Sequence, residues 1–383
     1  MNKLFYLFLS SALFAITQQK QHIAFAGSFS NNISPSIEEL KQIIDDKYII
    51  GDIEDKHLHN GAIDGILRSL DPYSTYFDEE ELKSFDEKTN GMFSGVGVQI
   101  IKTGNDDVMV SSVFKGAPAD RAGIVIGDLI LQVDDETITG LKLGQISKLM
   151  RGKMGTKVRL TMYRPTTGET YSKVLVREDV KLKNVSGRVI DGKIAVVEIK
   201  IWNNQTYNSF VETINNIRKQ NNIVGLIVDL RNNPGGLLES AVDVANLFLS
   251  NGQLITSVVG RNGKKEFDYI ARNKENVFDD LPIVLLVNKG SASASEVLAG
   301  CLQDYGIATL IGEQTFGKAL VQQIFSMRTT NGAVKLTTGQ YHTPKDKKIN
   351  GVGIKPDIEV SERRGKGYDD ILDRAIKYIK SKV

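Results

Sequence analysis

Residues 281–296, LPIVLLVNKGSASASE, decide the fold of the second half of this 383-residue chain. They open with an apolar run that is typical of a buried strand, and Asn288-Lys-Gly290 then indicates a turn. Small hydroxyl side chains follow among alanines, where a helix should begin. A buried strand that delivers a serine to a helix N-terminus can present its hydroxyl as a nucleophile, and small neighbours let a substrate backbone come close. The segment therefore predicts a nucleophilic serine.

The same alternation of strand and helix extends on both sides of this segment, from residue 185 to residue 360. Strand–helix–strand order predicts a layered α/β domain with its site at the C-terminal ends of the strands. The predicted strands cover 194–201, 225–230 and 283–287, and the predicted helices carry Phe210, Ile214 and Ile217 on one face or cover 237–249.

Residues 92–180 have a different character, with short apolar strands between glycine-rich turns and room for two helices, over 117–122 and 143–150. This pattern predicts a compact β-rich module. At its start, Gly95-Val96-Gly97-Val98 precedes a strand and can present backbone amides to a terminal carboxylate, with an extended peptide pairing to the sheet edge. A plain glycine-rich strand start is the alternative.

The N-terminus is typical of an export signal. Lys3 supplies a positive start, residues 4–16 are apolar, and Ala24-Phe25-Ala26 is a cleavage pattern. The apolar stretch is short for a membrane span, which needs roughly 20 residues, and an uncleaved membrane anchor is the alternative. A capping box at Ser36 predicts one helix, residues 58–70 predict a second, and residues 368–383 predict a C-terminal helix.

The composition excludes several function classes. The net charge of +2 gives no argument for nucleic-acid binding, and one cysteine, Cys301, excludes an internal disulfide. His57 and His59 stand without clustered acids or cysteines, so no metal site is expected. His342 is a weak candidate for a general base.

Lysine can replace histidine as a base if burial lowers its pKa from about 10.4 to near 7–8, a change of roughly 4 kcal/mol. Lys318 lies among apolar residues, and in a helix Gln322 would share its face and accept a hydrogen bond from the amine. An exposed lysine on a surface helix is the alternative. Residues 312–318 also match the start of a phosphate-binding loop, but Ala319 stands where Ser or Thr should hold magnesium, which disfavours nucleotide binding.

Residues 229–236, DLRNNPGG, follow a predicted strand and precede a predicted helix. Gly235 and Gly236 can present backbone N–H groups there without side-chain obstruction, which suits an oxyanion hole. A strand–helix turn that needs only the flexibility of glycine is the alternative reading of the same residues.

Taken together, these segments resemble the carboxy-terminal processing proteases, which are serine peptidases with a Ser-Lys dyad and a PDZ domain. The resemblance covers nearly the whole predicted mature chain. Tyr73 stands where the family has a histidine, and Ala319 stands where it has a glycine. The matching segments are LDPYSTYF at 70–77, the PDZ-like residues 92–180, DLRNNPGG at 229–236, SASASE at 291–296, TFGK at 315–318, YHTP at 341–344 and GIKPD at 353–357.

The resemblance implies roles for individual residues. It places the nucleophile at Ser293, the general base at Lys318 and a lysine-orienting glutamine at Gln322. The oxyanion hole falls on the amide of Ala294 with that of Gly235 or Gly236, the carboxylate loop of the PDZ domain on Val96 to Val98 beside Gly95, and a residue that couples the PDZ domain to activity on Arg151.

The resemblance also implies a mixed α/β multidomain fold with a crotonase-like catalytic domain, and an exported, periplasmic endopeptidase that captures substrates by their free C-termini. No metal, nucleotide or other cofactor is expected. Attachment to the inner membrane, a homodimer, and a catalytically inactive PDZ scaffold are kept as alternatives. The expected domains are a signal peptide at 1–26, a helical region at 27–91, a PDZ domain at 92–180, a catalytic domain at 181–360 and a C-terminal helix at 361–383.

Overall fold

The computed structural model describes residues 33–50, 53–104, 107–181, 183–272, 277–278, 280–361, 363–365 and 368–383. The chain forms two compact units, residues 1–63 and residues 64–383. The predicted export signal at 1–26 lies outside the described residues. None of the helices in the described ranges is both long enough and apolar enough to cross a bilayer.

Two helices, α1 (Ile33–Lys47) and α2 (Asp55–Arg68), lie at the N-terminal end of the described chain. The prediction that Ser36 caps the first helix is wrong, because α1 begins three residues earlier and contains Ser36. Pro35 allows this start, since the first turn of a helix leaves its N–H groups unpaired and tolerates proline. An ion pair of 2.9 Å between Lys41 and Asp55 joins the two helices.

A β-rich module follows, and its two ends pair with each other. Strand β2 (Met92–Gly95) runs antiparallel to β9 (Glu178–Lys181), so the chain enters and leaves the module side by side. The module has its own apolar core, built around Val110, Ile146 and Leu160. Its sheet has the order β3 (Val98–Lys102), β4 (Val108–Val113), β5 (Leu129–Val133), β7 (Lys157–Arg164), β8 (Glu169–Val176), with β6 (Glu136–Thr137) beside β5, and its helices are α4 (Pro118–Arg121) and α5 (Leu143–Met150).

The six-stranded sheet that follows the β-rich module along the chain is mostly parallel, and its strands alternate between two apolar cores. Val228 and Leu285 face the core that contains α6 (Thr206–Gln220), α7 (Leu238–Asn246) and α8 (Ala294–Asp304), whereas Ile227 and Val284 face the core that contains α9 (Asp370–Lys380). This alternation is the period of two that a strand covered on both faces requires. The order is β10 (Val185–Ile190), β11 (Ile194–Ile199), β12 (Gly225–Asp229), β15 (Ile283–Val287), β16 (Ala308–Gly312), β19 (Ile358–Glu359).

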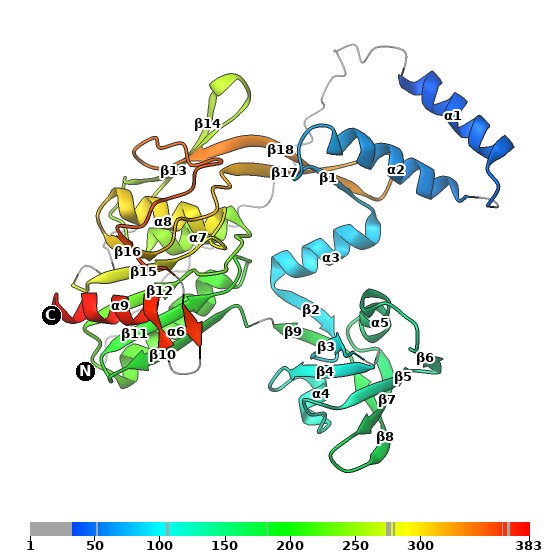
Figure 1. Cartoon of the computed structure of the whole chain (residues 1–383), viewed down its shortest axis with the longest axis horizontal. Coiled ribbons are helices and arrows are strands. Elements are labelled where there is room, and N and C mark those ends of the chain that lie inside the picture. The colour runs from blue at the N-terminus through cyan, green and yellow to red at the C-terminus, as the bar shows by residue number, and fades with distance from the viewer. Residues whose placement is uncertain are drawn as a thin grey trace, which may run out of the picture. The chain divides into compact units, whose positions relative to one another are not determined.

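A second, antiparallel sheet carries the segment after Lys318. Here β17 (Leu320–Ser326) and β18 (Ala333–His342) run side by side (Figure 1), and β18 also pairs with β1 (Thr75–Phe77) and β13 (Leu254–Val259). The predicted helix around Gln322 is therefore wrong. The remaining elements are α3 (Glu79–Asn90), β14 (Lys265–Ile270), a 3-10 turn (Arg261–Gly263), β20 (Arg364–Gly365) and β21 (Tyr368–Asp369).

Helix α3 links β1 to β2 along the chain, and both of its ends are capped. The Asp78 side chain accepts the N–H groups of Glu80 and Glu81, and Gly91 ends the helix in the left-handed conformation. These caps satisfy backbone groups that would otherwise lack partners. The predicted fold class, a mixed α/β chain with a β-rich module and a layered catalytic region, is confirmed.

Candidate active site

Two of the serines in the SASAS segment have structural roles. The hydroxyl of Ser291 donates to the carbonyl oxygen of Leu230 at 2.8 Å. The hydroxyl of Ser295 accepts from the indole N–H of Trp202 at 2.9 Å and donates to the carbonyl oxygen of Asn233 at 3.1 Å. Both serines are buried, so their hydroxyls fix α8 against the strand ends instead of facing a substrate.

Ser293 differs from both neighbours in exposure and in backbone conformation. It is partly exposed and occupies the position before α8, with φ 57° and ψ −120°. This region is strained for a residue with a Cβ, and such strain occurs preferentially at functional sites. Ser293 thus ends the connection from β15 to α8 in a strained conformation at the N-terminus of the helix, a position that can present a nucleophile.

Gly235 approaches Ser293 so closely that only glycine fits. A Cβ on Gly235 would lie 2.7 Å from Ser293 Cβ and 2.9 Å from the Ala292 carbonyl oxygen. Gly235 also has φ 103°, which favours glycine. The DLRNNPGG loop therefore lies directly against the serine, as the two motifs together predict.

The backbone N–H groups near Ser293 differ in availability. That of Gly235 donates to Asn233 Oδ1 at 3.0 Å. Those of Gly236 and Ala294 have no hydrogen-bond partner within the described ranges. Of the two alternatives considered from the sequence, Gly236 is thus the glycine with a free donor, together with Ala294 at the first position of α8.

Buried charges hold the same loop in place. The guanidinium of Arg231 binds Asp229 at 2.6 Å and Asp369 at 2.7 Å. Arg231 is almost fully buried, and its planar donors match both carboxylates. The arginine therefore ties the end of β12 to the start of α9, and so supports the glycines that follow it.

Lys318 precedes β17 and is partly buried. Burial lowers the pKa of its amine, and repulsion by Lys335 lowers it further, whereas the charge of Asp71 acts in the opposite direction. The amine also lies 4.4 Å from the centroid of the Tyr73 ring, and a cation–π contact of this kind favours the charged form. The lowered pKa moves the lysine toward the neutral form that a general base needs.

The LDPYS segment that carries Tyr73 is fastened by Asp71. Its carboxylate accepts the N–H groups of Tyr73 and Ser74 at 2.7 and 2.8 Å and the hydroxyl of Thr337 at 3.3 Å. Burial alone would raise the pKa of Asp71, but these hydrogen bonds outweigh it and lower the pKa. A fixed, charged Asp71 thus holds the ring of Tyr73 over Lys318.

Gln322 does not have the predicted contact with Lys318. Its side-chain amide donates to Thr337 Oγ1 at 3.3 Å, and no hydrogen bond joins it to Lys318 within the described ranges. The prediction assumed one helical face for both residues, whereas Gln322 lies in a strand. Thr337, which accepts the hydrogen bond from Gln322, in turn donates to the carboxylate of Asp71, so Gln322 is linked to the loop of Asp71.

Sequence reasoning missed two buried residues that contact both Ser293 and Lys318. Glu296 accepts the N–H groups of both, at 2.8 and 2.9 Å, and the hydroxyl of Tyr341 lies within hydrogen-bonding distance of both carbonyl oxygens. Both residues stand in segments that match the family, SASASE and YHTP, but the match assigned no role to either side chain.

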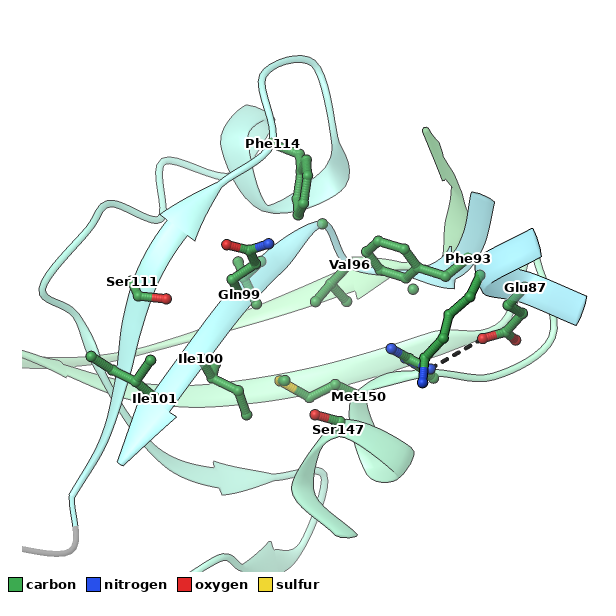
Figure 2. A pocket seen from close by; sticks show the side chains of 15 residues that line it. Glu87, Phe93, Val96, Gln99, Ile100, Ile101, Ser111, Phe114, Ser147 and Met150 are labelled. Atoms are coloured by element: carbon green, nitrogen blue, oxygen red, sulfur yellow. Dashed lines mark hydrogen bonds and ion pairs between the residues drawn. The ribbon is translucent and has the colours of Figure 1, made fainter. Parts of the chain in front are cut away.

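The β-rich module carries a groove of about 410 Å³ beside β3 and α5. Figure 2 shows Phe93, Val96, Phe114 and Met150 around it. The predicted peptide-binding residues Gly95, Val96, Gly97 and Val98 all line this groove, and its apolar walls suit an uncharged side chain.

Arg151 also lines this groove and directly follows α5. Its guanidinium pairs with Glu87 of α3 at 3.1 Å, drawn as a dashed line in Figure 2, and lies 5.3 Å from the centroid of Phe93. Arg151 thus connects the groove to the helix that leads back to β1.

The other candidates from the sequence have ordinary surroundings. His342 Nδ1 lies 2.6 Å from Asp346, and His57 and His59 lie on α2. Burial raises the pKa of the Cys301 thiol, which keeps it protonated. No cluster of three or more potential metal ligands occurs in the part of the chain that the structure describes.

Comparisons with known proteins match most of the chain. Residues 193–360 match the model for peptidase family S41, residues 109–164 a PDZ domain, and residues 14–81 the activating protease CtpB N-terminal domain. The carboxy-terminal-processing protease of Bartonella bacilliformis is 37% identical over 83% of this chain and 74% of its own length.

A CtpA-like serine protease of Staphylococcus aureus is 38% identical over 85% of this chain, which spans 64% of that protein. Among solved structures, the photosystem II D1 C-terminal processing protease is 28% identical, with 85% of this chain and 86% of that chain covered and a TM-score of 0.49.

Proposed function

This chain belongs to the carboxy-terminal-processing proteases, serine-type peptidases of family S41 with a PDZ domain, and from that premise we propose that it cleaves exported proteins near their C-termini by a Ser293–Lys318 dyad. The observation that carries the proposal is the contrast within one segment. Ser291 and Ser295 use their hydroxyls inside the fold, while Ser293 is partly exposed on a strained turn and Lys318 is a half-buried lysine with a lowered pKa.

In the proposed reaction, neutral Lys318 takes the proton of Ser293 as the serine oxygen attacks the scissile carbonyl carbon. The N–H groups of Gly236 and Ala294 stabilise the oxyanion, an effect of about 3–4 kcal/mol for one donor. The protonated lysine then gives its proton to the leaving amine. Water, deprotonated by the same lysine, then attacks the acyl-enzyme, and Lys318 returns the proton to the departing Ser293 oxygen, which restores the free enzyme.

The PDZ groove would hold the substrate tail. Backbone amides at Val96 to Val98 would bind the terminal carboxylate, and the tail would pair with β3. The apolar lining favours a tail that ends in uncharged residues. Arg151, which already pairs with a carboxylate in Glu87, would sense an occupied groove and pass the effect to α3.

Export to the periplasm completes the proposal, supported by the pattern of residues 1–26. Retention of this segment as an inner-membrane anchor, and assembly into a homodimer, are its variants. Fractionation of cells that express the whole chain, followed by mass determination of the purified protein, distinguishes cleavage from anchoring.

The test compares Ser293→Ala and Lys318→Ala with the wild type on a protein substrate that carries an apolar C-terminal tail. Both substitutions should abolish cleavage and leave tail binding unchanged. Ser291→Ala and Lys355→Ala are matched controls, because the first removes a structural hydroxyl and the second an exposed amine. Cleavage by both purified dyad variants at the wild-type rate would refute the dyad.

A PDZ scaffold without catalytic activity is the second candidate, favoured by the well-formed groove alone. It predicts that the wild-type protein binds the tailed substrate and never cleaves it. Direct turnover measurements, with the cleavage site read by mass spectrometry, separate the two functions.

A further inference from the structure

Glu296 is fully buried and accepts hydrogen bonds from two separate segments. One oxygen accepts the N–H groups of Ser293 at 2.8 Å and Lys318 at 2.9 Å. The other accepts the N–H of Gly317 at 2.7 Å and the hydroxyl of Thr315 at 2.5 Å. Hydrogen bonds to a carboxylate are stronger than those between neutral groups, so this one side chain joins the two segments firmly.

Tyr341 makes the complementary contacts from β18. Its hydroxyl lies 2.8 Å from the carbonyl oxygen of Ser293 and 2.5 Å from that of Lys318. Burial, and then the charge of Glu296, raise the pKa of Tyr341 well above its usual value, so the hydroxyl keeps its proton and donates. The two residues that Glu296 holds by their N–H groups are therefore also held by their carbonyl groups.

We propose that Glu296 and Tyr341 are positioning residues that together fix the nucleophile and the base of the dyad relative to each other. This inference rests on the proposed function. Ser293 lies before α8 and Lys318 lies before β17, so no single element sets their separation. Catalysis depends steeply on that separation, since a misplacement of about 1 Å can lower a rate by about 100-fold.

A purely structural role does not explain these contacts. A carboxylate at this position that only caps α8 would bind the N–H of Ser293, which completes the capping box of the helix. Three of the four groups bound by Glu296 instead lie at Thr315, Gly317 and Lys318. Glu296 also has no ion pair with a cation among the described residues, and such a carboxylate is costly to bury. Its contacts with both segments are explained if it positions the dyad.

The first test replaces Glu296 with glutamine, which has almost the same shape. Only one acceptor oxygen remains, and the new amide group faces two donors. We expect kcat to fall at least tenfold, with KM and the affinity for an uncleavable tailed peptide within twofold of the wild type. Asp304→Asn is the matched control, because Asp304 is a buried carboxylate at the other end of α8 that accepts the N–H of Lys345.

Tyr341→Phe keeps the test decisive if the glutamine variant does not fold, because it removes one hydroxyl and leaves the contacts of Glu296. We expect kcat to fall threefold to tenfold without a change in KM. Tyr305→Phe is its control, since the Tyr305 hydroxyl also donates to a backbone carbonyl, that of Leu254, at 3.1 Å.

The pH dependence of kcat/KM separates positioning from stability. A displaced Lys318 becomes more hydrated, its pKa rises, and the acid limb of the profile moves to higher pH. The other charged groups near the amine, Lys335 and Asp71, are unchanged in both variants. A smaller folded fraction instead lowers kcat/KM by the same factor at every pH and leaves the acid limb at the same pH.

Wild-type kcat per folded molecule with an unshifted profile, in whichever of the two variants folds, would overturn the inference. That result differs from failure of the proposed function, which appears as cleavage by Ser293→Ala. An inactive Ser293→Ala together with fully active Glu296 and Tyr341 variants would keep the dyad and reject the positioning pair.

Discussion

At the scale of single residues, Ser293 combines a necessary side chain with an unfavourable backbone. Its positive φ costs a residue with a Cβ about 1–3 kcal/mol, which glycine avoids. We therefore expect Ser293→Gly to be more stable than Ser293→Ala by about 1 kcal/mol, after the greater freedom of glycine in the unfolded chain is subtracted.

Urea denaturation of both variants measures this difference, and both should be inactive, so activity cannot confound it. Gly235 is adjacent and stays unchanged in each. Equal midpoints would mean that the turn at Ser293 relaxes without its side chain and stores no strain.

Lys318 should make stability depend on pH. Its pKa is lowered below the usual 10.5, so the unfolded chain binds a proton that the folded chain releases. The resulting destabilisation is fully present below the folded pKa and disappears as pH rises toward 10.5. We expect Lys318→Met to raise Tm at pH 7 by about 2 °C, with a smaller gain at pH 10.

Calorimetry at pH 7 and pH 10 measures both values of Tm. Lys355→Met is the control, because Lys355 is exposed and its replacement should leave Tm unchanged at both pH values. If the increase in Tm from Lys318→Met were larger at pH 10 than at pH 7, burial of the charged amine would not be what destabilises the folded protein.

The sequence identified the residues of the candidate site better than their contacts. Ser293, Lys318 and the paired glycines all belong to recognisable motifs, because a nucleophile and its oxyanion donors need particular residue types in a particular order. The contacts of Glu296 and Tyr341 could not be predicted, since they join segments that only the folded sheets bring together.

At the scale of elements, the turn before β3 depends on Gly97. It has φ 82°, and a Cβ there would lie 2.2 Å from Ala117 Cβ. We expect Gly97→Ala to displace the loop and weaken binding of a C-terminal peptide at least tenfold. Gly116→Ala is the control, because Gly116 has φ 79° but nothing within 4 Å of its added Cβ.

Peptide titration by fluorescence anisotropy measures both variants. Unchanged affinity for Gly97→Ala would exclude this turn from tail binding. A loss of equal size in both variants would assign the effect to backbone strain alone.

Elements defined by local apolar runs were predicted well, and one defined by distant pairing was not. The strand Ile283–Val287 and the helix Leu143–Met150 match the predicted ranges. The predicted contact between Lys318 and Gln322 required a helix, because residues four apart share a helical face. The pairing of the segment around Gln322 with β18 decides the outcome, and a strand partner is a tertiary contact that a local pattern does not contain.

At the scale of the whole molecule, the PDZ module is built as an insertion with its own core. Its apolar cluster shares no residue with the two clusters of the catalytic sheet, and β2 pairs with β9 at its ends. We expect residues 92–181 to fold alone in a single cooperative transition. Circular dichroism during heating measures this, with residues 98–176, which lack both terminal strands, as the less stable comparison.

An unfolded 92–181 fragment would mean that the module depends on contacts with the catalytic region. The motifs predicted this organisation along the chain. They did not predict that β1 and β17 would share one strand partner, β18, which brings Tyr73 to Lys318.

The lowered pKa of Lys318 should make its amine more reactive toward electrophilic reagents. An uncharged amine is a nucleophile, and the lowered pKa of Lys318 raises the fraction of that side chain in the uncharged form. Cyanate or an activated ester, used sparingly at pH 7, should therefore carbamylate or acylate Lys318 early, together with Lys335, whose pKa burial also lowers, and peptide mapping would find the tags there. The burial that lowers the pKa of Lys318 and so suits it to act as a base would then also make it a site at which a chemical reagent inactivates the protein.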